Sequence, residues 1–179
     1  MALDLKILIL SDANSIHTLK WVESIREHHA NLMLFSLFKP KKDYLKRYIK
    51  LNVDVKTPDL KSKIRNIRNP NFSKLNYLIG IRQLKRIIND FQPNILHAHY
   101  ASSYGVLAFI SNYKPFILSV WGSDILDFPN RNFFNKWLLK KVINSASTIC
   151  STSQVMKKNI CDNYNRYDIE LIPFGVDIN

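Results

Sequence analysis

Glycine and cysteine are scarce in this sequence, whose 179 residues include only four glycines and two cysteines. Cys150 and Cys161 are too few for a disulfide framework and lack the spacing of metal ligands, so we expect reduced thiols. No apolar run approaches the roughly 20 residues that a membrane-spanning helix needs, and residues 1–6 do not resemble a secretory signal. These absences exclude a disulfide-rich secreted scaffold and favour a cytoplasmic protein.

Several motifs that carry well-known chemistry are also absent. The sequence contains no G-x-G-x-x-G, P-loop, H-E-x-x-H or C-x-x-C pattern. The polar residues 11–15, which follow the first apolar run, include no glycine. A dinucleotide-binding fold needs glycines at that turn, so an oxidoreductase that uses NAD or FAD is disfavoured.

Positive charge is concentrated in one part of the chain. The formal net charge is +12, and residues 39–90 contain 15 Lys or Arg against four Asp, whereas the remainder is nearly neutral. Such a segment attracts polyanions, among them nucleic acid, anionic lipid and phosphorylated substrates. Residues 39–72 within it read as a basic, insertion-like stretch.

Short apolar strands alternate with amphipathic helices along the whole sequence. Because parallel strands need crossover connections, this order predicts an α/β fold: a doubly wound, mainly parallel sheet with helices on both faces, in one Rossmann-like domain over residues 1–179. The predicted strands are 6–10, 31–38, 51–55, 94–98, 115–120, 148–150 and 169–172. The predicted helices are 16–25, 43–51, 73–91, 102–112, 131–144 and 153–161, with 58–68 a helix or a loop.

Ligands of such sheets bind beyond the carboxyl ends of the strands, where the first loop carries Asp12, Asn14, Ser15 and His17. Its backbone N–H groups could meet an anion, or Asn14 or Ser15 could simply cap the next helix. His17 is either a cleft residue or a surface histidine.

The predicted strand 94–98 leads into a second polar loop. Alternation along a strand places His97 and His99 on one face, next to Tyr100. A metal pair would need a third ligand, and none follows at a clear spacing. We expect one histidine to be hydrogen-bonded within the sheet and the other to line a cleft.

Two further loops follow strands 115–120 and 148–150. In the first, Gly122 permits a close backbone approach, and Asp124 is placed to bind sugar hydroxyls, to transfer a proton or to close a turn. In the second, Ser151 and Ser153 form either a phosphate or hydroxyl site or a plain helix cap.

Five segments in order carry a family likeness. They are KILILSDANSIHTLKW (6–21), PNILHAHY (93–100), FILSVWGSDI (116–125), STSQVMKKNI (151–160) and PFGVD (173–177). The chain resembles the N-terminal domain of a GT-B glycosyltransferase of family 4. It departs from the family pattern at Asp12-Ala13, where a glycine pair is usual, and at Trp121, where a histidine often precedes Gly-Ser-Asp.

The resemblance implies a retaining transfer of sugar from a nucleotide sugar, without a metal or other cofactor. It implies that Asp124 and His99 are catalytic, that the first loop faces the donor phosphates, and that the acceptor meets His97, Tyr100, Trp121, Gly122, Ser123, Ser151 and Ser153. The donor-binding C-terminal domain lies outside this sequence, in the same gene or in a separate chain, and we expect little turnover without it.

The resemblance also suggests a role for the basic stretch, because related enzymes act on lipid-linked or polyanionic acceptors at the inner membrane face. Residues 43–51 have the layout of an interfacial helix, or of a solvated helix whose apolar side covers the core. The candidate membrane or polyanion contacts are Lys41, Lys42, Lys46, Arg47, Lys50, Lys61, Lys63, Arg65 and Arg68.

Other functions remain open at this point. The acceptor-binding domain could serve the synthesis of lipopolysaccharide, capsule or exopolysaccharide. Alternatively, the chain could be a non-catalytic, membrane-recruiting subunit of a two-chain transferase. A general polyanion-binding α/β module is less favoured, because no motif for specific nucleic-acid recognition is present. Sugar-nucleotide epimerases share the GT-B architecture and are a minor alternative.

Overall fold

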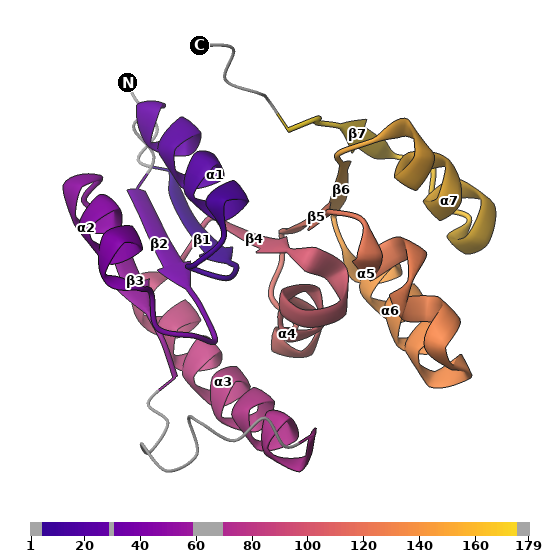
Figure 1. The fold of residues 1–179 in the computed structure, drawn as a ribbon, viewed down its shortest axis with the longest axis horizontal. Coiled ribbons are helices and arrows are strands. Elements are labelled where there is room, and N and C mark those ends of the chain that lie inside the picture. The colour runs from indigo at the N-terminus through magenta and orange to yellow at the C-terminus, as the bar shows by residue number, and fades with distance from the viewer. Residues whose placement is uncertain (1–4, 29–30, 59–69, 175–179) are drawn as a thin grey trace. The chain divides into compact units, whose positions relative to one another are not determined.

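The computed structural model describes residues 5–28, 31–58 and 70–174, the side chains of 70–76 excepted. It divides into two compact units, Met1–Ile95 and Leu96–Asn179, which are described in turn (Figure 1).

The first unit contains three parallel strands in the order β3-β2-β1: β1 (Lys6–Leu10), β2 (Asn31–Phe35) and β3 (Asp54–Lys56). The connecting helices are α1 (Ile16–Glu27) and α2 (Lys42–Lys50), and α3 (Pro70–Phe91) follows β3. After Lys6, β1 is an unbroken apolar run, because both of its faces are covered, as is usual for parallel strands.

Helices cover both faces of these three strands. On one face, Ile7 and Leu34 join a core with Leu19 of α1 and Tyr48 of α2. On the other face, Gly80 brings α3 so close that an added Cβ would lie 3.0 Å from Leu37 and 4.0 Å from Phe35. This unit therefore has the doubly wound arrangement that the alternating pattern predicts.

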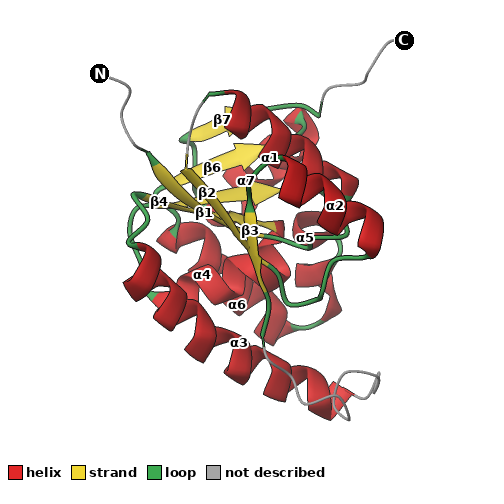
Figure 2. Ribbon diagram, turned by 90° about the vertical axis from the view of Figure 1, so that its left-hand side faces the viewer, coloured by secondary structure: helices red, strands yellow, loops and turns green. Residues whose placement is uncertain are grey.

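The second unit contains four parallel strands in the order β4-β5-β6-β7: β4 (Ile95–His99), β5 (Phe116–Val120), β6 (Thr148–Ser151) and β7 (Ile169–Leu171). The longer helices are α4 (Gly105–Ser111), α6 (Phe133–Ser145) and α7 (Gln154–Tyr164), and α4 packs beside α6 (Figure 2). The parallel pairing and the covering helices confirm the predicted Rossmann-like α/β class.

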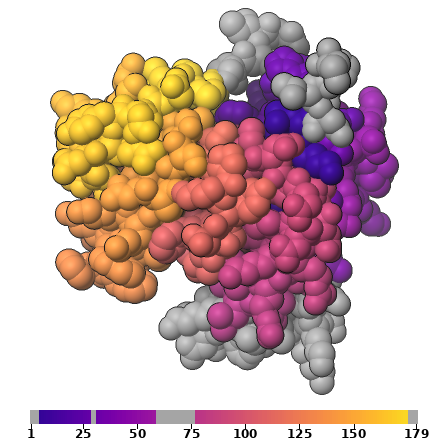
Figure 3. Space-filling model, turned by 180° about the vertical axis from the view of Figure 1, so that it is seen from behind, coloured from indigo at the N-terminus to yellow at the C-terminus, as the bar shows by residue number. Residues whose placement is uncertain are grey.

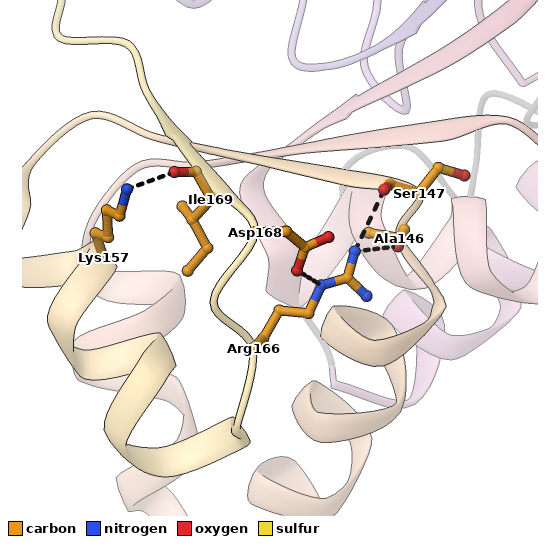
Figure 4. A network of polar contacts seen from close by, with 6 residues as sticks. All are labelled: Ala146, Ser147, Lys157, Arg166, Asp168 and Ile169. Atoms are coloured by element: carbon orange, nitrogen blue, oxygen red, sulfur yellow. Dashed lines mark hydrogen bonds and ion pairs between the residues drawn. The ribbon is translucent and has the colours of Figure 1, made fainter.

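A polar network holds the last strand of this unit (Figure 4). The Arg166 guanidinium donates to the carbonyls of Ala146 and Ser147 at 2.8 and 3.3 Å and pairs with Asp168 at 2.5 Å. Lys157 donates to the Ile169 carbonyl at 2.7 Å. The Arg166 bonds tie the α7–β7 connection to the segment that joins α6 to β6, and the Lys157 bond ties the start of β7 to α7.

Several predicted boundaries were wrong for identifiable reasons. Strand 51–55 is displaced to Asp54–Lys56, because Asn52 takes a positive φ of 54° and ends α2. Helix 102–112 is split: a π-helical turn covers Tyr100–Tyr104, and α4 begins only at Gly105. The short helices α5 (Ser123–Leu126) and Phe128–Arg131 were not predicted. Residues 59–68 of the predicted basic helix or loop lie outside the described residues.

No helix among the described residues has the length and apolar character needed to span a bilayer.

Candidate functional site

The side chain of Asp124 connects the loops at the carboxyl ends of β4 and β5. Its carboxylate accepts backbone N–H groups from Ala101 at 2.7 Å, Gly122 at 2.9 Å and Trp121 at 3.1 Å. Asp124 is fully buried. Burial raises the pKa of this carboxyl, and the three N–H bonds oppose that shift by stabilising the charged form. One carboxylate thus fixes the backbone of two loops that are distant in sequence.

Tyr100 begins the π-helical turn after β4 in an uncommon backbone conformation. Its φ is +71°, a region that residues other than glycine seldom occupy and that recurs at functional sites. The Tyr100 hydroxyl hydrogen-bonds to the hydroxyl of Ser123, the first residue of α5. Tyr100 is half-buried and Ser123 is exposed, so these two side chains are accessible to a ligand, whereas Asp124 is not.

The backbone conformation at position 122, and not a lack of space for a side chain, requires glycine there. Its φ of +139° is strained for any residue with a side chain, whereas a Cβ at this position would meet no atom within 4 Å. Within the described residues, the glycine serves to turn the chain from β5 into α5.

His97 and His99 are both buried. The His97 Nε2 atom lies 2.8 Å from the Ser119 hydroxyl, which confirms that one histidine is hydrogen-bonded within the sheet. The two rings meet edge to face, with centroids 4.5 Å apart. Burial lowers the pKa of His97 to about 4, and burial together with His97 lowers the pKa of His99. Both rings are neutral at pH 7.

Trp121 covers the second histidine. The ring of His99 lies 5.0 Å from that of Trp121, which in turn contacts Phe174 at 5.6 Å. The expectation that one histidine lines an open cleft was wrong, because His99 is fully buried and Trp121 is the half-buried residue at the surface. Across the described residues, no group of three His, Cys, Asp or Glu side chains is arranged to hold a metal.

Ser151 and Ser153 have the geometry of a helix cap. The Ser153 hydroxyl accepts the Met156 N–H at 3.3 Å, at the start of α7. Ser151 is buried, and its hydroxyl donates to the Ser153 carbonyl at 2.8 Å. Of the two interpretations of this loop, these contacts support the cap.

The first loop is braced by its own side chains. Asp12 accepts the Asn14 N–H at 2.9 Å, while the Asn14 amide donates to the Lys39 carbonyl at 3.2 Å and accepts the Lys41 N–H at 2.8 Å. Ser15 precedes α1 without a side-chain cap bond, so the predicted side-chain cap of α1 was wrong for both candidates. His17 is half-buried and is the second residue of α1.

Helix α2 has its aromatic and aliphatic residues on different faces. Tyr48 is fully buried and donates to the Ala13 carbonyl at 3.0 Å, and Tyr44 packs against the same core. Leu45 and Ile49 are 40% and 67% exposed. The single apolar face that was predicted is therefore divided between core and solvent. Among the basic candidates, Lys41, Lys42, Lys46, Arg47 and Lys50 are exposed, and Lys61, Lys63, Arg65 and Arg68 lie outside the described residues.

Sequence reasoning did not find the partners of Asp124. The bond to the Ala101 N–H joins positions 23 residues apart, and no local pattern connects them. The role of Phe174 against Trp121 was missed for the same reason. The pair Ser102-Ser103, whose side chains compete for backbone hydrogen bonds, was the one available sign of an irregular turn.

Comparison with known proteins places this geometry in a family. TuaC of Bacillus subtilis (strain 168), whose name assigns it as a teichuronic acid biosynthesis glycosyltransferase, is 26% identical over 93 residues, which are 50% of this chain and 24% of TuaC. The structure of Anabaena Alr3699/HepE in complex with UDP superposes with a TM-score of 0.68 at 15% identity, over 97% of this chain and 45% of HepE.

A Listeria monocytogenes protein described as a UDP-N-acetylglucosamine 2-epimerase superposes with a TM-score of 0.61 at 10% identity, over 93% of this chain and 44% of that protein. At such identities the likeness shows the fold alone, a Rossmann-like half of a GT-B architecture, which unrelated reactions share. The chain spans about a quarter of TuaC and less than half of HepE. A family model matches residues 6–153, and the chain belongs to the glycosyl transferase 4-like family.

Proposed function

We propose that this chain is the acceptor-binding domain of a glycosyltransferase that moves a sugar, with retention of configuration, from a nucleotide sugar to a glycan or lipid-linked acceptor. Its membership of the glycosyl transferase 4-like family supports the reaction class. The arrangement that carries the acceptor role is the accessible cluster of Tyr100, Ser123 and Trp121. Hydroxyl groups beside an aromatic ring offer the hydrogen bonds and the apolar face that a sugar requires.

In this proposal, Asp124 and His99 position the groups of the site and do not contact the acceptor themselves. Both are fully buried, and the Asp124 carboxylate is engaged by three backbone N–H groups. We therefore assign Asp124 to positioning the loops that carry Tyr100 and Ser123. We assign His99 to supporting the Trp121 ring, which it contacts.

The donor side of the reaction belongs to a second domain in this proposal. The chain covers 45% of HepE, a protein whose structure contains UDP. Asp12, Asn14, Ser15 and His17 would face the donor phosphates, and the C-terminal domain would hold the nucleotide. The isolated chain would then bind acceptor but turn over little.

Binding experiments on the chain test this division of labour. Titration with UDP-glucose and GDP-mannose should give only feeble binding, whereas saturation-transfer NMR with a panel of mono- and disaccharides should find at least one that binds. Tyr100→Phe and Ser123→Ala should weaken that signal, and Tyr167→Phe, at an exposed tyrosine of the same unit, should not. Tight nucleotide-sugar binding, or equal sugar signals in all variants, would contradict the acceptor role.

The cell-surface role and the membrane location are also proposals. TuaC is named for teichuronic acid biosynthesis, which favours a polysaccharide or glycolipid product. Exposed Leu45 and Ile49 on α2, flanked by Lys46 and Lys50, support peripheral docking on the inner face of the plasma membrane. Co-sedimentation with anionic vesicles should fall for Leu45→Ser combined with Ile49→Ser, and unchanged co-sedimentation would exclude α2 as a contact.

A further inference from the structure

Helix α6 exposes three aromatic side chains near its start. Phe133 is 84% exposed, more than any other large apolar side chain among the described residues, and Phe134 and Trp137 are 63% and 46% exposed. The opposite side of the same helix packs in the core through Leu139, Val142 and Ile143, which are at most 1% exposed. The aromatic residues are thus displayed on a well-anchored helix and are not needed to hold it.

The exposed rings form an ordered group. Phe134 and Trp137 are one helical turn apart, with centroids 5.8 Å apart at an interplanar angle of 31°. The Lys141 ammonium lies 5.9 Å from the centroid of the Trp137 ring, on the next turn. In the space-filling view the region of α6 is the orange surface at the lower left (Figure 3). A preformed aromatic surface of this kind loses little side-chain freedom on docking.

The charge around these rings has one sign. The sequence has no Asp or Glu from Phe128 to Cys161. The same stretch places Arg131 just before α6 and three exposed lysines on it, which are Lys136, Lys140 and Lys141. The partner of this surface should therefore be negatively charged at the point of contact.

We propose that this α6 face, formed by Phe133, Phe134 and Trp137 with the four basic residues around them, docks on an anionic lipid bilayer. Aromatic rings that enter the headgroup boundary, beside lysines that remain in the aqueous layer, are the pattern of a helix lying in a membrane interface. Protein–protein interfaces select against lysine, which disfavours a protein partner. The proposal is independent of the acceptor role, and it names a membrane contact in the second unit, whereas the basic segment belongs to the first.

Fluorescence with brominated lipids tests insertion directly. Vesicles of phosphatidylcholine with 30% phosphatidylglycerol should quench the chain's tryptophan emission when the acyl chains carry bromine, and pure phosphatidylcholine should quench it much less. Trp137→Phe keeps the surface apolar and removes its fluorophore, so this variant should lose most of the quenching. Quenching that persists in Trp137→Phe would overturn the assignment to α6.

Partition of the chain into the same vesicles provides the second measurement. Phe133→Ser combined with Phe134→Ser should lower the partition coefficient about tenfold, and Lys140→Glu combined with Lys141→Glu should lower it for anionic vesicles. Val155→Ser, at a residue 68% exposed on α7, is the matched control and should change nothing. Ile49→Ser measures the separate contribution of α2. Equal partition in all α6 variants, or a concentration-dependent dimer that the Phe133→Ser/Phe134→Ser variant abolishes without any loss of lipid binding, would refute the proposal.

Discussion

The carboxylate of Asp124 accepts the backbone N–H of Ala101 at 2.7 Å, across 23 residues of sequence. With the N–H groups of Trp121 and Gly122 on its other oxygen, this side chain supplies an acceptor to two separate loops. The geometry of the accessible cluster therefore depends on a residue that is itself inaccessible.

Replacing Asp124 with Ala should destabilise the fold strongly. The buried N–H of Ala101 and the partly buried N–H groups of Trp121 and Gly122 would lose their acceptor. A buried loss costs about 1–3 kcal/mol, and water compensates in part at the two partly buried groups. Urea unfolding monitored by circular dichroism should show a loss of several kcal/mol. Asp127→Ala, at an exposed position in the same segment, is the control, and losses of similar size in the two variants would contradict the bracing role.

Gly122→Ala should destabilise the chain through backbone conformation alone. Its φ of +139° costs a residue with a Cβ about 1–3 kcal/mol, although the space beside it is open. Gly105→Ala should also destabilise, but for a different reason: φ is an ordinary −60°, and the new Cβ would lie 2.9 Å from Leu118.

A double-mutant cycle separates these two causes. Shortening Leu118 to Val should offset part of the Gly105→Ala loss and none of the Gly122→Ala loss. The free energies of unfolding of the three single variants and the two double variants provide the test. Rescue of Gly122→Ala would show that crowding, and not backbone strain, requires the glycine.

Stability should fall in mild acid because of His97. Its pKa is lowered from 6.5 to about 4, so below pH 6.5 the unfolded chain binds a proton that the folded chain excludes. The neutral ring contributes fully to the free energy of unfolding above pH 6.5, and this contribution is lost as the pH falls toward 4. The loss between pH 7.5 and pH 5 amounts to about 2 kcal/mol. Burial lowers the pKa of His99 too, which adds to the effect, whereas the raised pKa of Asp124 opposes it.

His97→Gln isolates this contribution. Glutamine can still bond to Ser119 but does not titrate, so the difference in unfolding free energy between pH 7.5 and pH 5 should shrink. His28→Gln, at an exposed histidine, should leave that difference unchanged. An equal pH dependence in wild type and His97→Gln would show that His97 is not responsible.

Tyr48→Phe should cost about 1 kcal/mol of stability, since it leaves the buried Ala13 carbonyl without its hydroxyl donor. Burial raises the pKa of Tyr48, in keeping with a hydroxyl that donates and does not ionise. Tyr44→Phe, on the same helix but only partly buried, should cost less. Thermal melting of both variants decides the point, and equal melting temperatures would contradict it.

The strands and the fold class could be predicted because their signal is local. Residues 7–10 form an unbroken apolar run, and both faces of that strand are buried, so the sequence pattern and the packing agree. The cap by Ser153 follows from the residue type beside the helix. The family could be predicted as well, because five segments occur in the right order.

The sequence predicted which residues belong to the candidate site, but it did not predict how they contact one another. The loops around Tyr100 and Asp124 were identified, but the bond between them is long-range and no periodicity encodes it. The division of α2 into a buried Tyr48, a partly buried Tyr44 and the exposed Leu45 and Ile49 could not be predicted from its sequence, because all four side chains suit either environment.

Asn14 has a practical consequence for building hybrids of this family. Its one amide holds both the Lys39 carbonyl and the Lys41 N–H, so the entry to the divergent basic stretch is fastened to the loop after β1. Because both partners are backbone groups, a hybrid that exchanges the stretch after Pro40 keeps these two bonds as long as Asn14 is retained and no proline stands at position 41. Replacing Asn14 in the loop after β1 would instead remove both bonds at once.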